Sequence, residues 1–169
     1  SEDALAELTC ARLGSRRAPR VLIGGLGMGF TLAAALRSLD DDARVVVAEL
    51  VPGVVRWNRG LLGDVAGFPL RDPRASVYDG DVADLIWQPP APWDAILLDV
   101  DNGPVGLTRD TNDGLYSAQG LDRAFGAIKP GGALSIWSAA PDRAFTRRRY
   151  ASCTDGLDRN GFNDQSAPR

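Results

Sequence analysis

One stretch, residues 20–30 with the sequence RVLIGGLGMGF, constrains the fold of this chain more than any other. A short apolar run, residues 21–23, meets a cluster of glycines and then a helix-forming stretch, residues 31–39. Glycines in such a turn adopt positive φ and let a ligand approach the backbone, while the first N–H groups of the helix face that ligand. The pattern predicts a phosphate- or nucleoside-binding turn of an open α/β sheet. A structural strand-to-helix turn without a ligand is the alternative.

The spacing of the glycines narrows the class of ligand. Gly25, Gly27 and Gly29 form G-x-G-x-G, and the third glycine of a dinucleotide motif would fall on Phe30. This spacing favours a site of the S-adenosylmethionine type over a nicotinamide or flavin site. A nicotinamide-dependent oxidoreductase is therefore a disfavoured alternative.

The rest of the chain alternates short apolar runs with helical patterns. Strands are expected at residues 21–23, 44–48, 75–78, 94–98 and 133–138, and helices at 2–13, 31–39, 52 to about 62, 82–87 and 117–128. Residues 63–74 and 100–116 are expected to be loops. This alternation predicts an α/β fold with a Rossmann-like, doubly wound and mostly parallel sheet. We expect a single domain over residues 1–142 and an irregular or disordered tail over residues 143–169, which lack apolar periodicity.

Composition excludes several classes of function. The net charge of −3 favours neither nucleic acid nor a membrane as partner. The chain has no histidine, which removes the usual general base and the commonest metal ligand. Cys10 and Cys153 are isolated, so they form no metal spacing and suggest no disulfide framework. With no apolar run that approaches a membrane span, we expect a cytoplasmic protein without a metal.

Acidic residues stand at or just after the carboxyl ends of three of the expected strands. Ligands of open parallel sheets bind at these ends. Glu49 ends the second strand, the usual place of a ribose ligand, although a strand-end acid can simply be solvated. Asp81 follows the third strand, near where a purine amino group commonly lies, and it could also cap the next helix. Asp99 and Asp101 follow the fourth strand and are the candidates for chemistry, although 101–103 can also be only a turn.

The ordered set of motifs resembles the spermidine synthase (polyamine aminopropyltransferase) family, which has the class I S-adenosylmethionine-dependent methyltransferase fold. The resemblance spans about residues 20 to 145 and rests on GGLGMG (24–29), AEL (48–50), GDV (80–82), LDVDNGP (98–104), Leu115-Tyr116, and LSIWSA (134–139) after KPGG (129–132).

The resemblance implies roles for these motifs. Glu49 would bind the ribose hydroxyls, Asp81 the adenine amino group, and Asp99, with Asp101, would orient or deprotonate an attacking amine. The implied ligand-binding residues are Gly25, Leu26, Gly27, Gly29, Glu49, Leu50, Gly80, Asp81 and Val82. The implied co-substrate is S-adenosylmethionine or its decarboxylated form, without a metal. The implied acceptor is a small molecule such as a polyamine, and a homodimer is left open.

The sequence also departs from this family. Gly27 stands where the family has an aspartate that holds the terminal amine of the decarboxylated donor, and Asp99 and Asp101 are spaced differently from the family's two acids. The small N-terminal β-domain has no counterpart, and neither does the final antiparallel hairpin of the fold. We therefore expect a transferase of an aminopropyl or methyl group, with a non-catalytic nucleoside-binding homologue as the alternative.

Overall fold

A computed structural model describes residues 2–99 and 114–137 of the 169-residue chain. Its strands are β1 (Arg20–Gly24), β2 (Arg44–Glu49), β3 (Ala75–Asp79), β4 (Trp93–Leu98) and β5 (Ile128–Ile136). Its helices are α1 (Glu2–Leu13), α2 (Phe30–Ser38), α3 (Pro52–Arg59), α4 (Val82–Trp87) and α6 (Ala118–Gly126). The predicted alternation of strands and helices is confirmed. The expected tail (143–169) and the region of the final hairpin lie outside the described residues.

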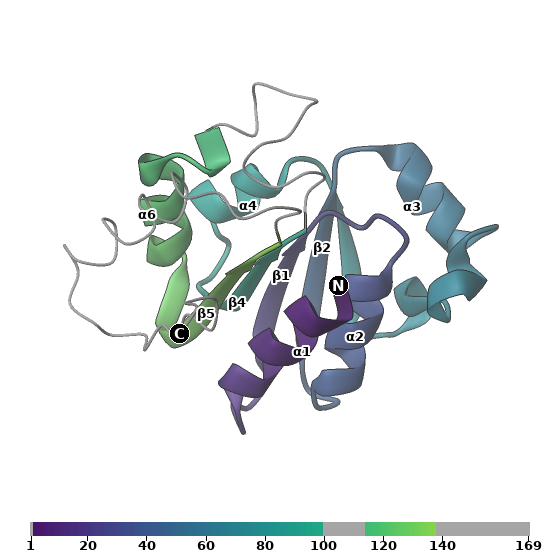
Figure 1. The fold of residues 1–169 in the computed structure, drawn as a ribbon, viewed down its shortest axis with the longest axis horizontal. Coiled ribbons are helices and arrows are strands. Elements are labelled where there is room, and N and C mark those ends of the chain that lie inside the picture. Colours follow the sequence, from purple (N-terminus) through teal and green to yellow (C-terminus); the bar gives the residue numbers. More distant parts are fainter. Residues whose placement is uncertain (1, 100–113, 138–169) are drawn as a thin grey trace, which may run out of the picture.

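The five strands form one parallel sheet in the order β3-β2-β1-β4-β5 (Figure 1). The chain runs outward from the central β1 through β2 to β3, then crosses to β4 on the other side of β1 and continues to β5. Such a reversal opens a crevice at the carboxyl ends of the two strands that flank it, here β1 and β4. The glycine-rich turn follows β1 and Asp99 follows β4, so both lie at this crevice.

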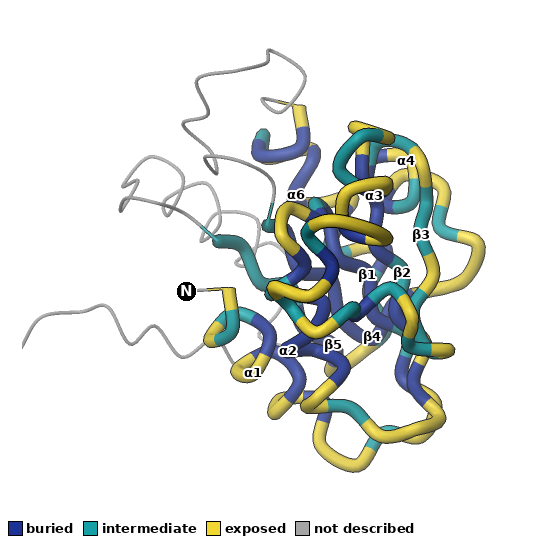
Figure 2. Tube along the Cα trace, turned by 90° about the vertical axis from the view of Figure 1, so that its right-hand side faces the viewer, coloured by how far each residue is buried: buried dark blue, intermediate teal, exposed yellow. Residues whose placement is uncertain are grey.

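Helices cover both faces of the sheet, as the Rossmann-like prediction requires. Val21 and Ile23 pack with α1, α2 and α3 on one face, whereas Leu22 packs with α4 and α6 on the other. Figure 1 shows these two groups of helices on opposite sides of the strands, and Figure 2 shows the central strands buried between them. A strand buried on both faces needs continuous apolar residues, which explains runs such as 45–48 in β2.

The structure differs from the local predictions at three places. Helix α3 ends at Arg59 rather than at about residue 62. The expected loop over residues 63–74 contains two 3₁₀ turns, Gly63–Ala66 and Pro69–Arg71. The fifth strand begins at Ile128 rather than at residue 133, so α6 ends earlier than predicted. Trp93 pairs with Ile128 but Ala95 pairs with Ala133, so residues 129–132 bulge opposite Asp94 alone. This bulge brings the Lys129 ammonium to 2.8 Å from the Asp94 carboxylate, which local sequence patterns do not report.

Candidate functional site

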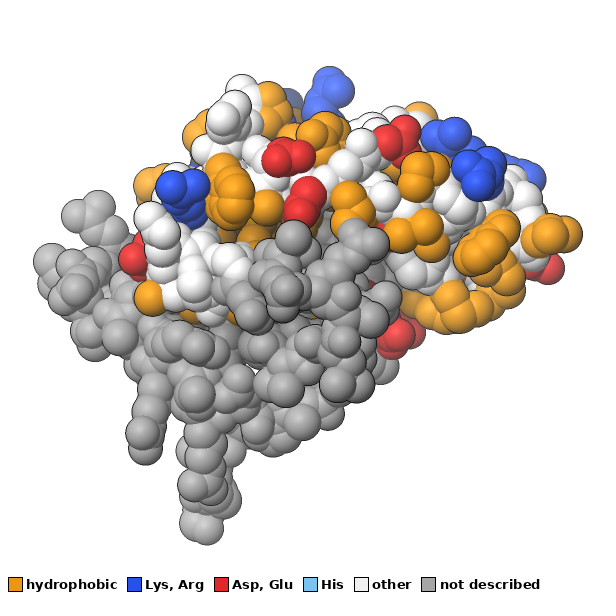
Figure 3. Space-filling view, turned by 90° about the horizontal axis from the view of Figure 1, so that it is seen from above, with side chains coloured by type: hydrophobic (Ala, Val, Ile, Leu, Met, Phe, Trp, Pro, Cys, Tyr) orange, Lys and Arg blue, Asp and Glu red, His pale blue; other side chains and the backbone are white. Residues whose placement is uncertain are grey.

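Hydrogen bonds between backbones tie four strand ends together at one edge of the sheet. The N–H of Gly25 donates to the carbonyl of Ala48 (2.9 Å), and the N–H of Asp99 donates to the carbonyl of Gly24 (2.9 Å). The N–H of Gly80 donates to the carbonyl of Glu49 (3.1 Å). The residues predicted to form a site therefore converge at the carboxyl ends of β1, β2, β3 and β4. Figure 3, seen from above this edge, shows acidic side chains among hydrophobic ones, with basic side chains farther out.

The glycine-rich turn has positive φ at Gly25, Gly27 and Gly29, as predicted for this motif. Gly29 has no room for a side chain, because a Cβ atom there would lie 2.9 Å from Oδ1 of Asn58. Gly27 differs, since a Cβ atom there would meet no heavy atom of the described residues within 4 Å. These residues therefore leave the side of the turn above Gly27 open, and Gly27 itself is exposed.

Glu49 is 8% exposed, and its carboxylate is held by two backbone donors. The N–H of Leu26, in the glycine-rich turn, donates to Oε2 (3.0 Å), and the N–H of Val51 donates to Oε1 (2.8 Å). A carboxylate offers about four acceptor positions, so each oxygen can accept a further hydrogen bond. Glu49 thus fixes the turn after β1 while retaining capacity for hydroxyl donors. The side chain of its neighbour Leu50 is 47% exposed.

Asp81 is the N-cap of α4, because its Oδ1 accepts a hydrogen bond from the N–H of Ala83 (2.9 Å). This confirms the capping role that the sequence left open, and the half-buried side chain has further acceptor capacity. Val82 is buried, and its methyl groups lie beneath Gly24, where a Cβ atom would approach one of them to 3.0 Å. In the GDV motif (80–82), the side chain of Val82 therefore packs in the core, whereas Gly80 and Asp81 lie nearer the surface.

Asp99 directly follows β4 and is half-buried, and a residue of α2 contacts its side chain. The hydroxyl of Thr31, in the first turn of α2, donates a hydrogen bond to Oδ2 of Asp99. Burial, together with the nearby Asp99 carboxylate, raises the pKa of the Tyr116 phenol well above its usual value. Thr31 therefore contacts the Asp99 carboxylate directly, and Tyr116 lies close enough for the charge of that carboxylate to act on its phenol. Asp101, the second predicted catalytic acid, lies outside the described residues.

Sequence reasoning missed three residues of this region. Thr31 looked like an ordinary first-turn residue, and Tyr116 belonged to a motif without an assigned role. Asn58 gave the only clear signal, because it is a polar residue four positions after Val54, on the face of α3 that carries apolar side chains. In the structure Asn58 is fully buried and contacts the glycine-rich turn.

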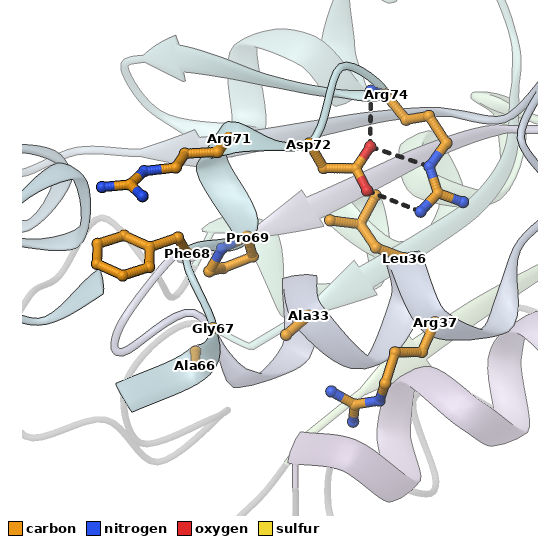
Figure 4. Close-up of a pocket in the computed structure, with 10 residues that line it drawn as sticks. All are labelled: Ala33, Leu36, Arg37, Ala66, Gly67, Phe68, Pro69, Arg71, Asp72 and Arg74. Atoms are coloured by element: carbon orange, nitrogen blue, oxygen red, sulfur yellow. Dashed lines mark hydrogen bonds and ion pairs between the residues drawn. The ribbon is translucent and has the colours of Figure 1, made fainter. Parts of the chain in front are cut away.

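A second depression is an open groove of about 590 Å³ beside α2, and it contains none of the predicted site residues. Of the arginines that line it, Arg37 forms an ion pair with Asp3 (2.8 Å), and Figure 4 shows Arg74 paired with Asp72. Arg74 forms an ion pair with Asp72 (2.8 Å), and the side-chain hydrogen bond from Arg74 lowers the pKa of Asp72. The guanidinium of Arg71 lies 3.6 Å from the ring centroid of Phe68. We therefore place the candidate site at the sheet edge, and not in this groove.

Residues 2–99 and 114–137 contain no group of three His, Cys, Asp or Glu side chains placed to hold a metal ion. In the same residues, no helix is long and apolar enough to cross a bilayer.

Solved structures of spermidine synthases and methyltransferases superpose on this chain. A spermidine synthase in complex with the transition-state analogue AdoDATO superposes with a TM-score of 0.69 at 20% identity, covering 91% of this chain and 49% of the other. The spermidine synthase of Thermotoga maritima gives 0.71 at 20% identity, covering 91% and 50%. The O-methyltransferase TomG of Streptomyces achromogenes, in complex with S-adenosylmethionine, gives 0.59 at 19% identity, covering 91% and 67%.

These likenesses show that the chain has the fold shared by spermidine synthases and class I methyltransferases. The chain spans about half the length of the two spermidine synthases. No protein-family model matches the sequence, and no curated protein matches it either.

Proposed function

We propose that the protein binds an S-adenosyl nucleoside at the carboxyl edge of its sheet and transfers an alkyl group from it to a small amine. The observation that carries this proposal is the Glu49 carboxylate, fixed by the N–H groups of Leu26 and Val51 beside the open glycine-rich turn. Two adjacent ribose hydroxyls can donate to such a carboxylate. Asp81 would then lie toward the adenine, and Asp99, on the neighbouring strand end, toward the acceptor.

The proposed reaction needs a base near the acceptor. A primary amine with a pKa of about 10 is mostly protonated at neutral pH and cannot attack carbon. The Asp99 carboxylate would bind the ammonium group, orient it and accept its proton. The nitrogen lone pair then forms a bond to the carbon next to sulfur, the carbon–sulfur bond breaks, and its electron pair neutralises the sulfonium. The products are an alkylated amine and a neutral thioether.

Calorimetry with four ligands tests this proposal. S-Adenosylmethionine, its decarboxylated form, methylthioadenosine and NAD would be titrated side by side into the full chain. We expect binding of the S-adenosyl ligands and no binding of NAD. Binding of NAD alone, or of none of the four, would overturn the proposal.

A non-catalytic nucleoside-binding protein is the second candidate, and Gly27 favours it over aminopropyl transfer. The family's aspartate for the donor amine is absent at this position, and nothing in the described residues fills the space above Gly27. Product formation separates the two candidates. The non-catalytic protein would bind methylthioadenosine or S-adenosylhomocysteine but release neither from a donor incubated with putrescine or another primary amine.

Glu49→Gln is expected to weaken binding of S-adenosylhomocysteine by about 10- to 100-fold, the loss typical of hydrogen bonds to a charged group. Glutamine keeps the volume, but its amide nitrogen would face one of the two backbone N–H donors and it carries no charge for the ribose. Calorimetry measures the loss. The matched control is the 2′-deoxy analogue of the ligand, whose affinity should change much less. An equal loss for both ligands would argue against a contact with the ribose.

Gly27→Asp is expected to shift the preference of the site toward the decarboxylated donor by about 10-fold or more. The space above Gly27 accepts a side chain, and aspartate is among the residues that tolerate its φ of +50°. The new carboxylate would attract the ammonium end of the decarboxylated donor and repel the carboxylate of S-adenosylmethionine. Gly27→Asn, of the same shape but neutral, is the control. An unchanged ratio of the two affinities in Gly27→Asp would mean that the ligand tail lies elsewhere.

A further inference from the structure

Asn58, on α3, is a fully buried amide whose two described hydrogen bonds both come from its nitrogen. Nδ2 donates to the carbonyl of Gly27 (2.8 Å) and to the carbonyl of Val54 (3.0 Å). Oδ1 is buried and has no hydrogen-bond partner among the described residues. The opposite orientation of the amide would turn Oδ1 toward two carbonyl oxygens, so the network itself fixes the orientation.

Burial of this amide is costly, which calls for a reason beyond packing. Asparagine is mostly exposed in proteins, and a buried acceptor without a partner destabilises the fold. Val55, the other buried residue of α3, is apolar and packs in the core. A leucine at position 58 would have the same branching and would leave no acceptor unpaired. Within residues 2–99 and 114–137, Asn58 forms one side-chain hydrogen bond outside its own helix, and its partner is Gly27.

That contact determines which way the next N–H points. The described peptide bonds are all trans, so the carbonyl of Gly27 and the N–H of Met28 lie on opposite sides of the peptide. Since Asn58 holds the carbonyl toward α3, the N–H of Met28 is turned away from α3. Both Gly27 and Met28 are exposed, and within the described residues this N–H has no hydrogen-bond partner.

We propose that Asn58 is a positioning residue, which holds the Gly27–Met28 peptide so that the Met28 N–H donates to the carboxylate of the nucleoside ligand's tail. This inference rests on the proposed function and makes it more specific. A backbone N–H recognises an anion, and no acidic side chain stands at Gly27 to oppose one. The site therefore selects S-adenosylmethionine, which retains its carboxylate, over the decarboxylated donor.

The single methionine of the chain allows a direct test. Labelling with ¹⁵N-methionine gives one backbone amide resonance from this sequence, that of Met28. We expect S-adenosylhomocysteine to shift this resonance strongly and methylthioadenosine, which lacks the carboxylate, to shift it much less. A Met28 amide that does not respond to the carboxylate-bearing ligand would overturn the inference.

Two variants of Asn58 test its role. Asn58→Ala removes both donors, and Asn58→Leu removes them while keeping the space filled. We expect each variant to weaken the binding of S-adenosylhomocysteine by about 10-fold or more. The binding of methylthioadenosine should weaken by less than about 2-fold. Val55→Ala, a buried substitution in the same helix without a bond to the turn, is the control and should leave the ratio of affinities unchanged.

The outcomes separate this inference from the proposed function. Equal losses for both ligands in the Asn58 variants would mean that Asn58 only stabilises the fold, and the inference would be wrong while the proposed function stands. A wild-type protein that binds neither ligand would overturn both.

Discussion

Asp99→Asn is expected to lower turnover by about 100- to 10,000-fold, the usual contribution of a positioned general base. Asparagine keeps the shape and can still accept the hydrogen bond from Thr31, but it cannot accept a proton or attract an ammonium group. Ligand affinity should stay within about threefold, because the nucleoside is proposed to be held by Glu49 and Asp81 instead. Release of the thioether product from donor and amine measures turnover, and calorimetry measures affinity.

The matched control for Asp99 is Asp41→Asn, which neutralises an exposed acid in the turn before β2, at the opposite edge of the sheet. It should leave turnover within about twofold, since a distant surface charge is screened by salt. Full activity in Asp99→Asn would exclude Asp99 as the base. If the wild-type protein binds the donor but turns over no amine, the non-catalytic alternative is the correct one.

Asp94→Ala is expected to lower the free energy of unfolding by about 3 kcal/mol, the range typical of a broken buried ion pair. Asp94 is 3% exposed at the start of β4. Its carboxylate accepts hydrogen bonds from the N–H of Arg20 (2.8 Å), from Arg16 (2.9 Å) and from Lys129 (2.8 Å). Alanine leaves the part-buried backbone donor of Arg20 without its acceptor and frees two cations, Arg16 in the segment between α1 and β1 and Lys129 in β5. Urea unfolding followed by circular dichroism measures the difference.

The same substitution should change how stability depends on pH. Burial alone would raise the pKa of Asp94, but the N–H of Arg20 and the side chains of Lys129 and Arg16 outweigh it and lower the pKa below its usual value. A carboxyl whose pKa is lower in the folded than in the unfolded state stabilises the fold fully above the unfolded pKa, about 3.9. This contribution is lost as the pH falls through the folded pKa. Asp94→Ala should therefore lose part of the wild-type acid sensitivity below about pH 4.

Two controls separate the buried carboxylate from charge in general. Asp3→Ala removes an exposed partner of Arg37, with side chains 50% and 61% exposed, and should cost less than about 1 kcal/mol. Asp94→Asn keeps an acceptor for the Arg20 N–H and should fall between the wild type and Asp94→Ala. Equal stabilities of Asp94→Ala and Asp3→Ala would contradict the structural role assigned to Asp94.

Elements whose cause is local could be predicted from the sequence. Helix α4 begins after its N-cap Asp81 and ends at Trp87, as predicted, because capping and the following glutamine and prolines act within a few residues. The apolar run 45–48 predicted a strand covered on both faces, and β2 is such a strand. The sequence also placed Glu49, Asp81 and Asp99 at one edge, since carboxyl ends of parallel strands share an edge.

The misplaced end of α6 and the misplaced start of β5 have a non-local cause. KPGG (129–132) has the composition of a turn. The sequence therefore predicts that the helix extends up to these residues and that the strand begins only after them. In the structure these residues belong to β5 as a bulge, because Ile128 and Ala133 both pair with β4 and Lys129 reaches Asp94. The pairing partner, and not the local composition, decided where the strand begins.

The sequence by itself determined the order of strands and helices, the open glycine-rich turn and the acids at the strand ends, because periodicity, capping and backbone freedom depend on neighbouring residues. Only the tertiary structure decided that Thr31 bonds Asp99, that Asn58 holds Gly27, and that Asp94 is buried with its cations. Each of these contacts joins residues far apart in the chain. Their geometry depends on how helices pack against a sheet, and a pattern within one segment carries no information about it.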